Sequence, residues 1–229
     1  SNNSAIAIGV SANASGNGSQ AVGYKANASG FASLALGVRS VANQTGAIAI
    51  GALSNATANN ATALGTNATA RANYSTAFGF DSSATKAAAL AIGGLSNASG
   101  LGSIAIGTYS NATADNASAQ GTNSLASGVN STAIGAESRA NATGSAAFGF
   151  SAEATGISSV SLGEDSAASA KDTTAVGQRA RASGSQSISI GADSTANSSA
   201  AVALGQSAQA IARNSVAIGF KAASSANNA

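Results

Sequence analysis

The chain has 229 residues, of which 4% are aromatic and 8% are charged, and it contains no Pro, Cys, Met, His or Trp. Most of its 44% hydrophobic fraction is alanine, which excludes a conventional core because little apolar area is available per residue. The formal charge of +2 argues against nucleic-acid binding through a basic patch, and the lack of cysteine excludes a disulfide scaffold and a thiolate metal site.

The sequence carries neither a recognisable signal peptide nor an apolar run that approaches transmembrane length. We therefore expect no direct membrane insertion by this chain. Because it lacks an initiator Met, we expect it to be a fragment of a longer protein.

A glycine recurs every 14 residues without an insertion or deletion. An internal period of this kind defines a repeat architecture before any local structure is assigned. The consensus unit is S-ϕ-A-ϕ-G-x-x-[AS]-x-A-x-x-x-x, where the ϕ directly before the glycine is a large apolar residue in fifteen of sixteen units and the ϕ three before it in nine. We call the periodic residues the repeat glycines: Gly9, Gly23, Gly37, Gly51, Gly65, Gly79, Gly93, Gly107, Gly121, Gly135, Gly149, Gly163, Gly177, Gly191, Gly205 and Gly219.

In chain order, each unit predicts a short strand, a turn at the repeat glycine, a second short strand and another turn. Around Gly107 the two strands fall in residues 103–106 and 110–112. A coiled coil would place its large apolar residues three and four apart, whereas here they lie two apart. A glycine in every unit would also cost a helix about 1 kcal/mol each time, and collagen is excluded because there is no proline. The pattern predicts an all-β parallel β-solenoid of about sixteen 14-residue coils.

Alternation along each strand separates small from large side chains. The residues two and four before the repeat glycine, and three and five after it, are Ala, Ser or Thr in every unit. A coil of 14 residues encloses a thin interior, so we expect these columns to fill it. The large residues one and three before the glycine must then project outward.

These outward residues form what we call the outer ladder. Leaving each side chain in water forgoes about 1.5–3 kcal/mol, and a stripe of this length exceeds the apolar patches typical of monomers. We therefore expect identical chains to cover it around a parallel axis. The predicted subunit-interface residues are Ile6, Ile8, Val22, Leu34, Leu36, Ile48, Ile50, Leu64, Phe78, Leu90, Ile92, Ile104, Ile106, Gln120, Ile134, Phe148, Val160, Leu162, Val176, Ile188, Ile190, Val202, Leu204, Val216 and Ile218.

One unit breaks the outer ladder with two polar residues, Ser118 and Gln120. In a trimer three Gln120 side chains would converge near the axis, where each needs a hydrogen-bond partner. We expect a ring of amide hydrogen bonds or trapped water there.

The segments "SLALG" (33–37), "GSIAIG" (102–107) and "NSVAIG" (214–219), each followed by Ala or Ser at the third and fifth positions after its glycine, resemble the head repeats of YadA-like trimeric autotransporter adhesins. The resemblance covers residues 1–229. It implies a left-handed parallel β-roll, a head made of three chains, display beyond the outer membrane at the bacterial cell surface, and binding to host extracellular matrix proteins, cell-surface receptors or other surfaces. The family's neck, stalk and membrane anchor have no counterpart here, so we expect them in a parent protein.

Two other functions stay open. The chain could be a passive spacer within a surface fibre. It could also be an ice-binding solenoid, which would need a regularly repeated outward column of Thr. This second alternative fits the sequence less well, because no outer column keeps Thr over more than two consecutive coils.

We expect no enzyme and no cofactor, because the eight carboxylates fall singly on outer turns, apart from the adjacent Glu164 and Asp165, and a thin solenoid offers no cleft to perturb their pKa values. Arg139, Arg179 and Arg181 are weak candidates for binding an acidic ligand, although solubilising charge is the simpler interpretation. Four aromatic residues directly follow a repeat glycine, and we expect them to pack at an edge between subunits: Tyr24, Phe80, Phe150 and Phe220.

Overall fold

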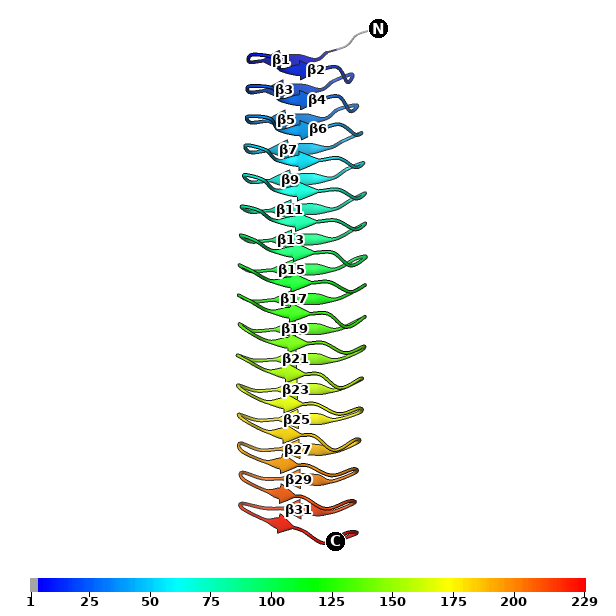
Figure 1. Cartoon of the computed structure of the whole chain (residues 1–229), viewed down its shortest axis with the longest axis vertical. Coiled ribbons are helices and arrows are strands. Elements are labelled where there is room, and N and C mark those ends of the chain that lie inside the picture. Colours follow the sequence, from blue (N-terminus) through cyan, green and yellow to red (C-terminus); the bar gives the residue numbers. More distant parts are fainter. Residues whose placement is uncertain (1–3) are drawn as a thin grey trace. The chain divides into compact units, whose positions relative to one another are not determined.

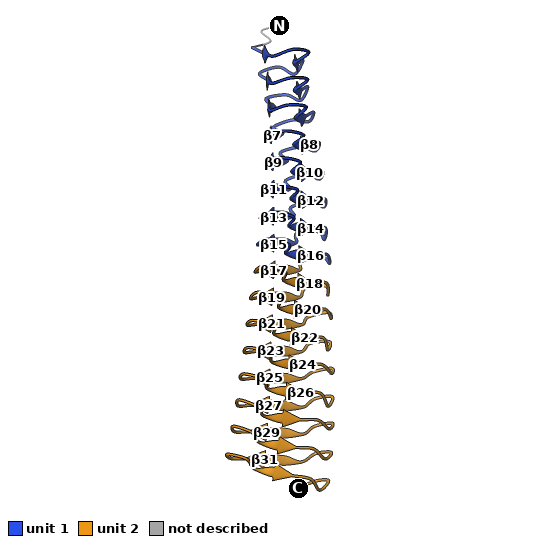
Figure 2. Cartoon of the chain, turned by 60° about the vertical axis from the view of Figure 1, so that its left-hand side comes forward, with its two compact units in different colours: residues 1–116 blue, residues 117–229 orange. Residues whose placement is uncertain are grey.

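The computed structural model describes residues 4–229. The chain divides into two compact units, unit 1 (residues 1–116) and unit 2 (residues 117–229), shown in Figure 2. Each unit is a stack of eight coils, and each coil consists of a three-residue strand, a turn, a two-residue strand and a second turn (Figure 1).

Unit 1 contains strands β1 to β16, which form two parallel ladders. The odd-numbered ladder is β1 (Ile6–Ile8), β3 (Gln20–Val22), β5 (Leu34–Leu36), β7 (Ile48–Ile50), β9 (Thr62–Leu64), β11 (Thr76–Phe78), β13 (Leu90–Ile92) and β15 (Ile104–Ile106). The even-numbered ladder is β2 (Asn13–Ala14), β4 (Asn27–Ala28), β6 (Val41–Ala42), β8 (Asn55–Ala56), β10 (Thr69–Ala70), β12 (Ser83–Ala84), β14 (Asn97–Ala98) and β16 (Asn111–Ala112).

Unit 2 repeats this arrangement with strands β17 to β32. Its odd-numbered ladder is β17 (Ser118–Gln120), β19 (Thr132–Ile134), β21 (Ala146–Phe148), β23 (Val160–Leu162), β25 (Thr174–Val176), β27 (Ile188–Ile190), β29 (Val202–Leu204) and β31 (Val216–Ile218). Its even-numbered ladder is β18 (Leu125–Ala126), β20 (Arg139–Ala140), β22 (Glu153–Ala154), β24 (Ala167–Ala168), β26 (Arg181–Ala182), β28 (Thr195–Ala196), β30 (Gln209–Ala210) and β32 (Ala223–Ser224).

Within each unit the residues of successive coils pair with a constant offset of 14 positions along the chain. In unit 1, Ala91 is in register with Ala105, and in unit 2, Ala203 is in register with Ala217. The constant repeat length makes this register possible, because an insertion would shift a whole coil by one residue and turn its side chains to the opposite face. The predicted all-β parallel solenoid of sixteen coils is confirmed.

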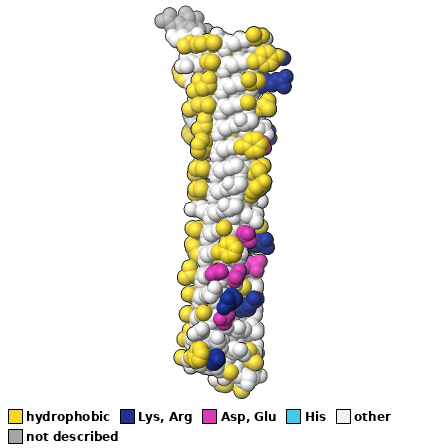
Figure 3. Space-filling model, turned by 90° about the vertical axis from the view of Figure 1, so that its left-hand side faces the viewer, with side chains coloured by type: hydrophobic (Ala, Val, Ile, Leu, Met, Phe, Trp, Pro, Cys, Tyr) yellow, Lys and Arg dark blue, Asp and Glu magenta, His cyan; other side chains and the backbone are white. Residues whose placement is uncertain are grey.

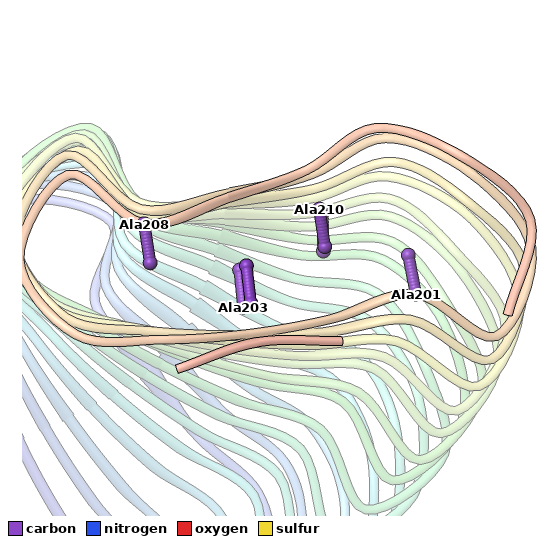
Figure 4. Close-up of a cluster of buried hydrophobic side chains, with 6 residues drawn as sticks. Ala201, Ala203, Ala208 and Ala210 are labelled. Atoms are coloured by element: carbon purple, nitrogen blue, oxygen red, sulfur yellow. The ribbon is translucent and has the colours of Figure 1, made fainter. Parts of the chain in front are cut away.

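The interior of each coil is thin, and it is filled by small side chains that project into it from both ladders. In unit 2, Ala201 and Ala203 project from one side and Ala208 and Ala210 from the other, and the four side chains point into the space between the two ladders (Figure 4). All four are fully buried. The prediction that the Ala and Ser columns fill the interior is confirmed, since nearly all of these residues are inaccessible to solvent.

Most of the buried serines satisfy their hydroxyl groups within their own turns, although in the part of the chain that the structure describes there is no partner for the Oγ atoms of Ser19, Ser131, Ser159, Ser187 and Ser224. The Ser110 Oγ donates a hydrogen bond to the Gly107 carbonyl at 2.8 Å, and the Ser103 Oγ donates to the Gly100 carbonyl at 2.8 Å. Each serine thus closes the turn that precedes it, because its own backbone N–H donates to the same carbonyl. Where this bond forms, the hydroxyl is buried with a partner, so serine can share the core columns with alanine.

The repeat glycines lie where the backbones of successive coils approach most closely. Gly135 has φ +128°, a conformation that side chains disfavour, and a Cβ placed on it would lie 2.3 Å from the carbonyl oxygen of Gly149. Both the dihedral angle and the close approach therefore require glycine at this position.

The width of the interior predicts the effect of a larger core side chain. Ala133→Leu should lower the free energy of unfolding by about 3 kcal/mol or more, because the added carbons have no space between the ladders. The matched control is Thr132→Leu, at the neighbouring outward position of β19, where Leu34 and Leu90 stand in other coils. Denaturant unfolding measures both variants, and equal stabilities would contradict the assignment of inside and outside.

The close approach of coils at the repeat glycines predicts that alanine is more destabilising at these positions than at other glycines. Gly135→Ala should cost at least about 2 kcal/mol, because the new Cβ meets rigid backbone and the residue keeps a strained φ. Gly94→Ala is the control, since its Cβ would lie 3.9 Å from its nearest neighbour, the Phe80 carbonyl oxygen, and its effect should stay within about 0.5 kcal/mol. A Gly135→Ala protein as stable as the control variant would refute the close approach of coils.

Candidate functional site

The outer ladder lies on the outward side of the odd-numbered strands in both units. In β15 the side chain of Ala105 is fully buried, whereas Ile104 and Ile106 on either side of it remain partly accessible. The same alternation recurs in β29, where Ala203 is buried between Val202 and Leu204. Strand alternation therefore places every large residue of the outer ladder outside the coil that carries it.

Many residues of the outer ladder are exposed rather than half-buried. None of its Ile, Leu, Val or Phe side chains is fully buried. Seven members in unit 2 are 37–69% exposed, which is high for branched aliphatic side chains, and Phe148, Val176, Val202 and Leu204 are half-buried. The exposed members in unit 1 are Ile6, Ile8, Leu36 and Phe78, and those in unit 2 are Ile134, Val160, Leu162, Ile188, Ile190, Val216 and Ile218. That these residues form a subunit interface stays a prediction.

Gln120 interrupts the outer ladder with a polar contact that the sequence did not reveal. Its Nε2 donates a hydrogen bond to the Ser118 Oγ at 3.1 Å, so the two outward side chains of β17 bond to each other across the buried Ala119. Both side chains are half-buried. The predicted ring of Gln120 side chains from several copies stays a prediction.

The turns at the repeat glycines form a second surface, which carries exposed aromatic residues and charges (Figure 3). Tyr24, Phe80, Phe150 and Phe220 are all exposed there, and Tyr109 is 58% exposed. The ammonium groups of Lys25 and Lys221 lie over the rings of Tyr24 and Phe220, at 5.2 and 5.1 Å from the ring centroids. The predicted packing of these aromatic residues between subunits stays a prediction.

Arg179 forms an ion pair with an acidic residue of the next coil. Its Nε lies 2.6 Å from the Asp193 Oδ1 and its Nη2 lies 3.1 Å from Oδ2, so the contact is bidentate. The hydrogen bond from Arg179 lowers the pKa of Asp193, and the same bond raises the pKa of Arg179. Arg181 lies in β26 of the same coil and is exposed. Of the two predicted ligand-binding arginines in this coil, Arg179 is thus already paired.

Arg139, the third candidate, lies in a mixed-charge hollow instead of a basic spot. The hollow has a volume of about 220 Å³ and is lined by Glu137, Arg139, Ser151 and Glu153. Glu153 lies in β22, in register with Arg139 of β20, so the expectation that all carboxylates fall singly on turns is wrong for this residue. Sequence reasoning missed the grouping because the residues are 14 and 16 positions apart, a separation that coil stacking converts into contact.

Within the described residues 4–229, no three His, Cys, Asp or Glu side chains lie close enough together to hold a metal ion. In the same part of the chain, no helix has the length and apolar character needed to cross a membrane.

The Arg179–Asp193 pair predicts how Asp193 titrates. Because the ion pair lowers the pKa of the folded protein's Asp193, the carboxylate contributes stability above its unfolded pKa and loses this contribution as the pH falls through the folded value. Arg179→Gln should therefore raise the protonation midpoint of Asp193, measured by carboxyl NMR shifts. Lys171→Gln is the matched control, because it also removes one cation from unit 2 but pairs with Asp172. An unchanged Asp193 midpoint in Arg179→Gln would show that the ion pair does not form in solution.

Comparisons with known proteins identify the family of the repeat. A crystal structure of the collagen-binding domain of the Yersinia adhesin YadA is similar over 100% of this chain and 79% of the other, at 19% sequence identity and a TM-score of 0.31. Among curated proteins no match was found. The family model for the YadA head domain repeat, which contains two copies of the repeat, matches residues 1–26, 28–54, 56–82, 84–110, 112–138, 126–152, 154–180, 182–208, 196–222 and 210–229. These matches span nearly the whole sequence, in segments close to two coils long, and the chain therefore belongs to the YadA head domain repeat family.

Proposed function

We propose that this chain is the head of a bacterial adhesin, that it assembles as a parallel homotrimer, and that it attaches to host extracellular matrix proteins, cell-surface receptors or other surfaces. The single observation that carries the proposal is the exposed outer ladder on a chain that belongs to the YadA head domain repeat family. The proposal places the head at the cell surface, beyond the outer membrane.

The exposed outer ladder supports self-association. In unit 2 seven of its aliphatic side chains are 37–69% exposed, and a contiguous apolar stripe of this kind is typical of an interaction surface. A second copy of the same chain offers apolar side chains at the same 14-residue spacing, so a parallel copy matches the outer ladder coil by coil.

The remaining outer surfaces are suited to binding through many weak contacts. The turns carry scattered aromatic rings, amides and mixed charges, and their acidic and basic residues are of comparable number in unit 2. Surfaces of this kind bind through many weak contacts, and three copies held side by side multiply the effective affinity by about 10² to 10⁴ when all can engage together. Assembly through the outer ladder would thus leave the turns free for attachment.

The proposal predicts that attachment depends on assembly. The purified chain should bind immobilised collagen, fibronectin or cultured host cells, and Ile190→Lys should weaken this binding at least tenfold, because a charge in the outer ladder separates the copies and removes avidity. Gln209→Lys is the matched control, since it adds the same charge at an exposed position of β30, outside both the outer ladder and the turns. Surface plasmon resonance and cell-adhesion counts measure both effects.

Two results would contradict the proposal in different ways. An assembled chain that binds none of these targets would favour the passive spacer. Equal binding by the wild-type chain and the Ile190→Lys variant would show that attachment does not need the assembly.

A further inference from the structure

Ser118 and Gln120, which we call the polar layer, differ in chemistry from the rest of the outer ladder. The residue directly before the repeat glycine is apolar in every coil except this one. In the next coil of unit 2, Ser118 is in register with Thr132 and Gln120 with Ile134. In the column directly before the repeat glycine, the polar layer is therefore followed immediately by an apolar side chain.

The hydrogen-bonding capacity of the polar layer extends beyond its own strand. A primary amide has two N–H donors and one carbonyl oxygen, and a serine hydroxyl both donates and accepts. The bond from the Gln120 Nε2 to the Ser118 Oγ uses one amide donor. It leaves the second N–H, the carbonyl oxygen and the hydroxyl proton for partners. These are both donors and acceptors, so identical layers on adjacent copies can satisfy one another.

A periodic interface has a register problem that the polar layer can solve. Sliding one copy by a single coil, about 4.8 Å, would still place apolar residues beside apolar residues, for example Leu204 beside Ile190. The same slide would place Gln120 beside Ile134, where its amide finds no partner. A polar group buried without a partner is strongly unfavourable, whereas one apolar contact exchanged for another costs little.

We propose that the polar layer fixes the axial register of neighbouring copies, by pairing with the polar layers of those copies and penalising every slipped alignment. The inference rests on the self-association given under Proposed function and adds to it the residues that determine alignment. A single polar position that specifies register within an apolar seam is well established for coiled coils, and here the same physics acts on stacked strands.

Disulfide trapping tests the alignment, because the chain has no native cysteine. Two chains with different affinity tags are coexpressed, one carrying Val176→Cys and the other Leu204→Cys. These positions lie in the same column, two coils apart, so in correct register they are separated by about 9.5 Å along the axis. That exceeds the Cα separation of up to about 6.8 Å that a disulfide allows. Chains that all carry Val176→Cys calibrate the yield of aligned pairs.

The proposal predicts little mixed disulfide in the wild-type background and at least about fivefold more after Gln120→Ile, since this replacement removes the penalty on slipping. Gln120→Ile should fold with an unchanged or higher thermal midpoint, because isoleucine occupies this column in other coils. Gln120→Leu provides a second variant with the same expectation. Phe148→Leu is the matched control. It replaces a larger side chain in the same column by one of the size common there, and it leaves the polar layer intact.

A mixed-disulfide yield that stays low in Gln120→Ile and Gln120→Leu would overturn the proposal, and so would an equal rise in Phe148→Leu. Failure of the proposed function looks different. In that case chains carrying Val176→Cys would give no disulfide and the wild-type chain would sediment as a monomer, so that no interface would exist to be aligned.

Discussion

The width of the coil interior is the constraint on which the rest of the structure depends. Fourteen residues close a loop around a space that holds alanine methyl groups and serine hydroxyls, as the buried set from Ala201 to Ala210 illustrates. Large apolar residues cannot enter without forcing the two ladders apart. They must stand on the outside of the strands that carry them, and they do so at nearly every coil.

This constraint also shapes the polar features of the coil. The interior supplies few apolar contacts, so much of the order comes from backbone hydrogen bonds between coils and from serines that bond to turn carbonyls. Each coil depends on the close approach of the next, which explains the repeat glycines and the absence of any insertion in sixteen units. Because the large apolar side chains are excluded from the interior, they form an apolar outer surface on which copies of the chain can meet.

The sequence alone predicted the strands, the interior columns and the outward position of the outer ladder. These follow from a two-residue alternation and a 14-residue period, which are both visible along the chain. It did not predict the Arg179–Asp193 ion pair, the hollow around Arg139 or the hydrogen bond between Ser118 and Gln120. Residues 14 apart stand in adjacent coils, so their proximity follows from the period, but whether their side chains meet depends on side-chain conformations, which have no periodic signature. The number of copies in the assembly likewise does not follow from the periodicity.

The central claim is that apolar residues excluded from a thin interior are covered by other copies of the same chain. Multi-angle light scattering of the purified chain, followed over a wide range of dilution, tests it most directly. The account predicts one species with three times the mass of a single chain. A stable, soluble monomer that persists at high protein concentration would contradict it.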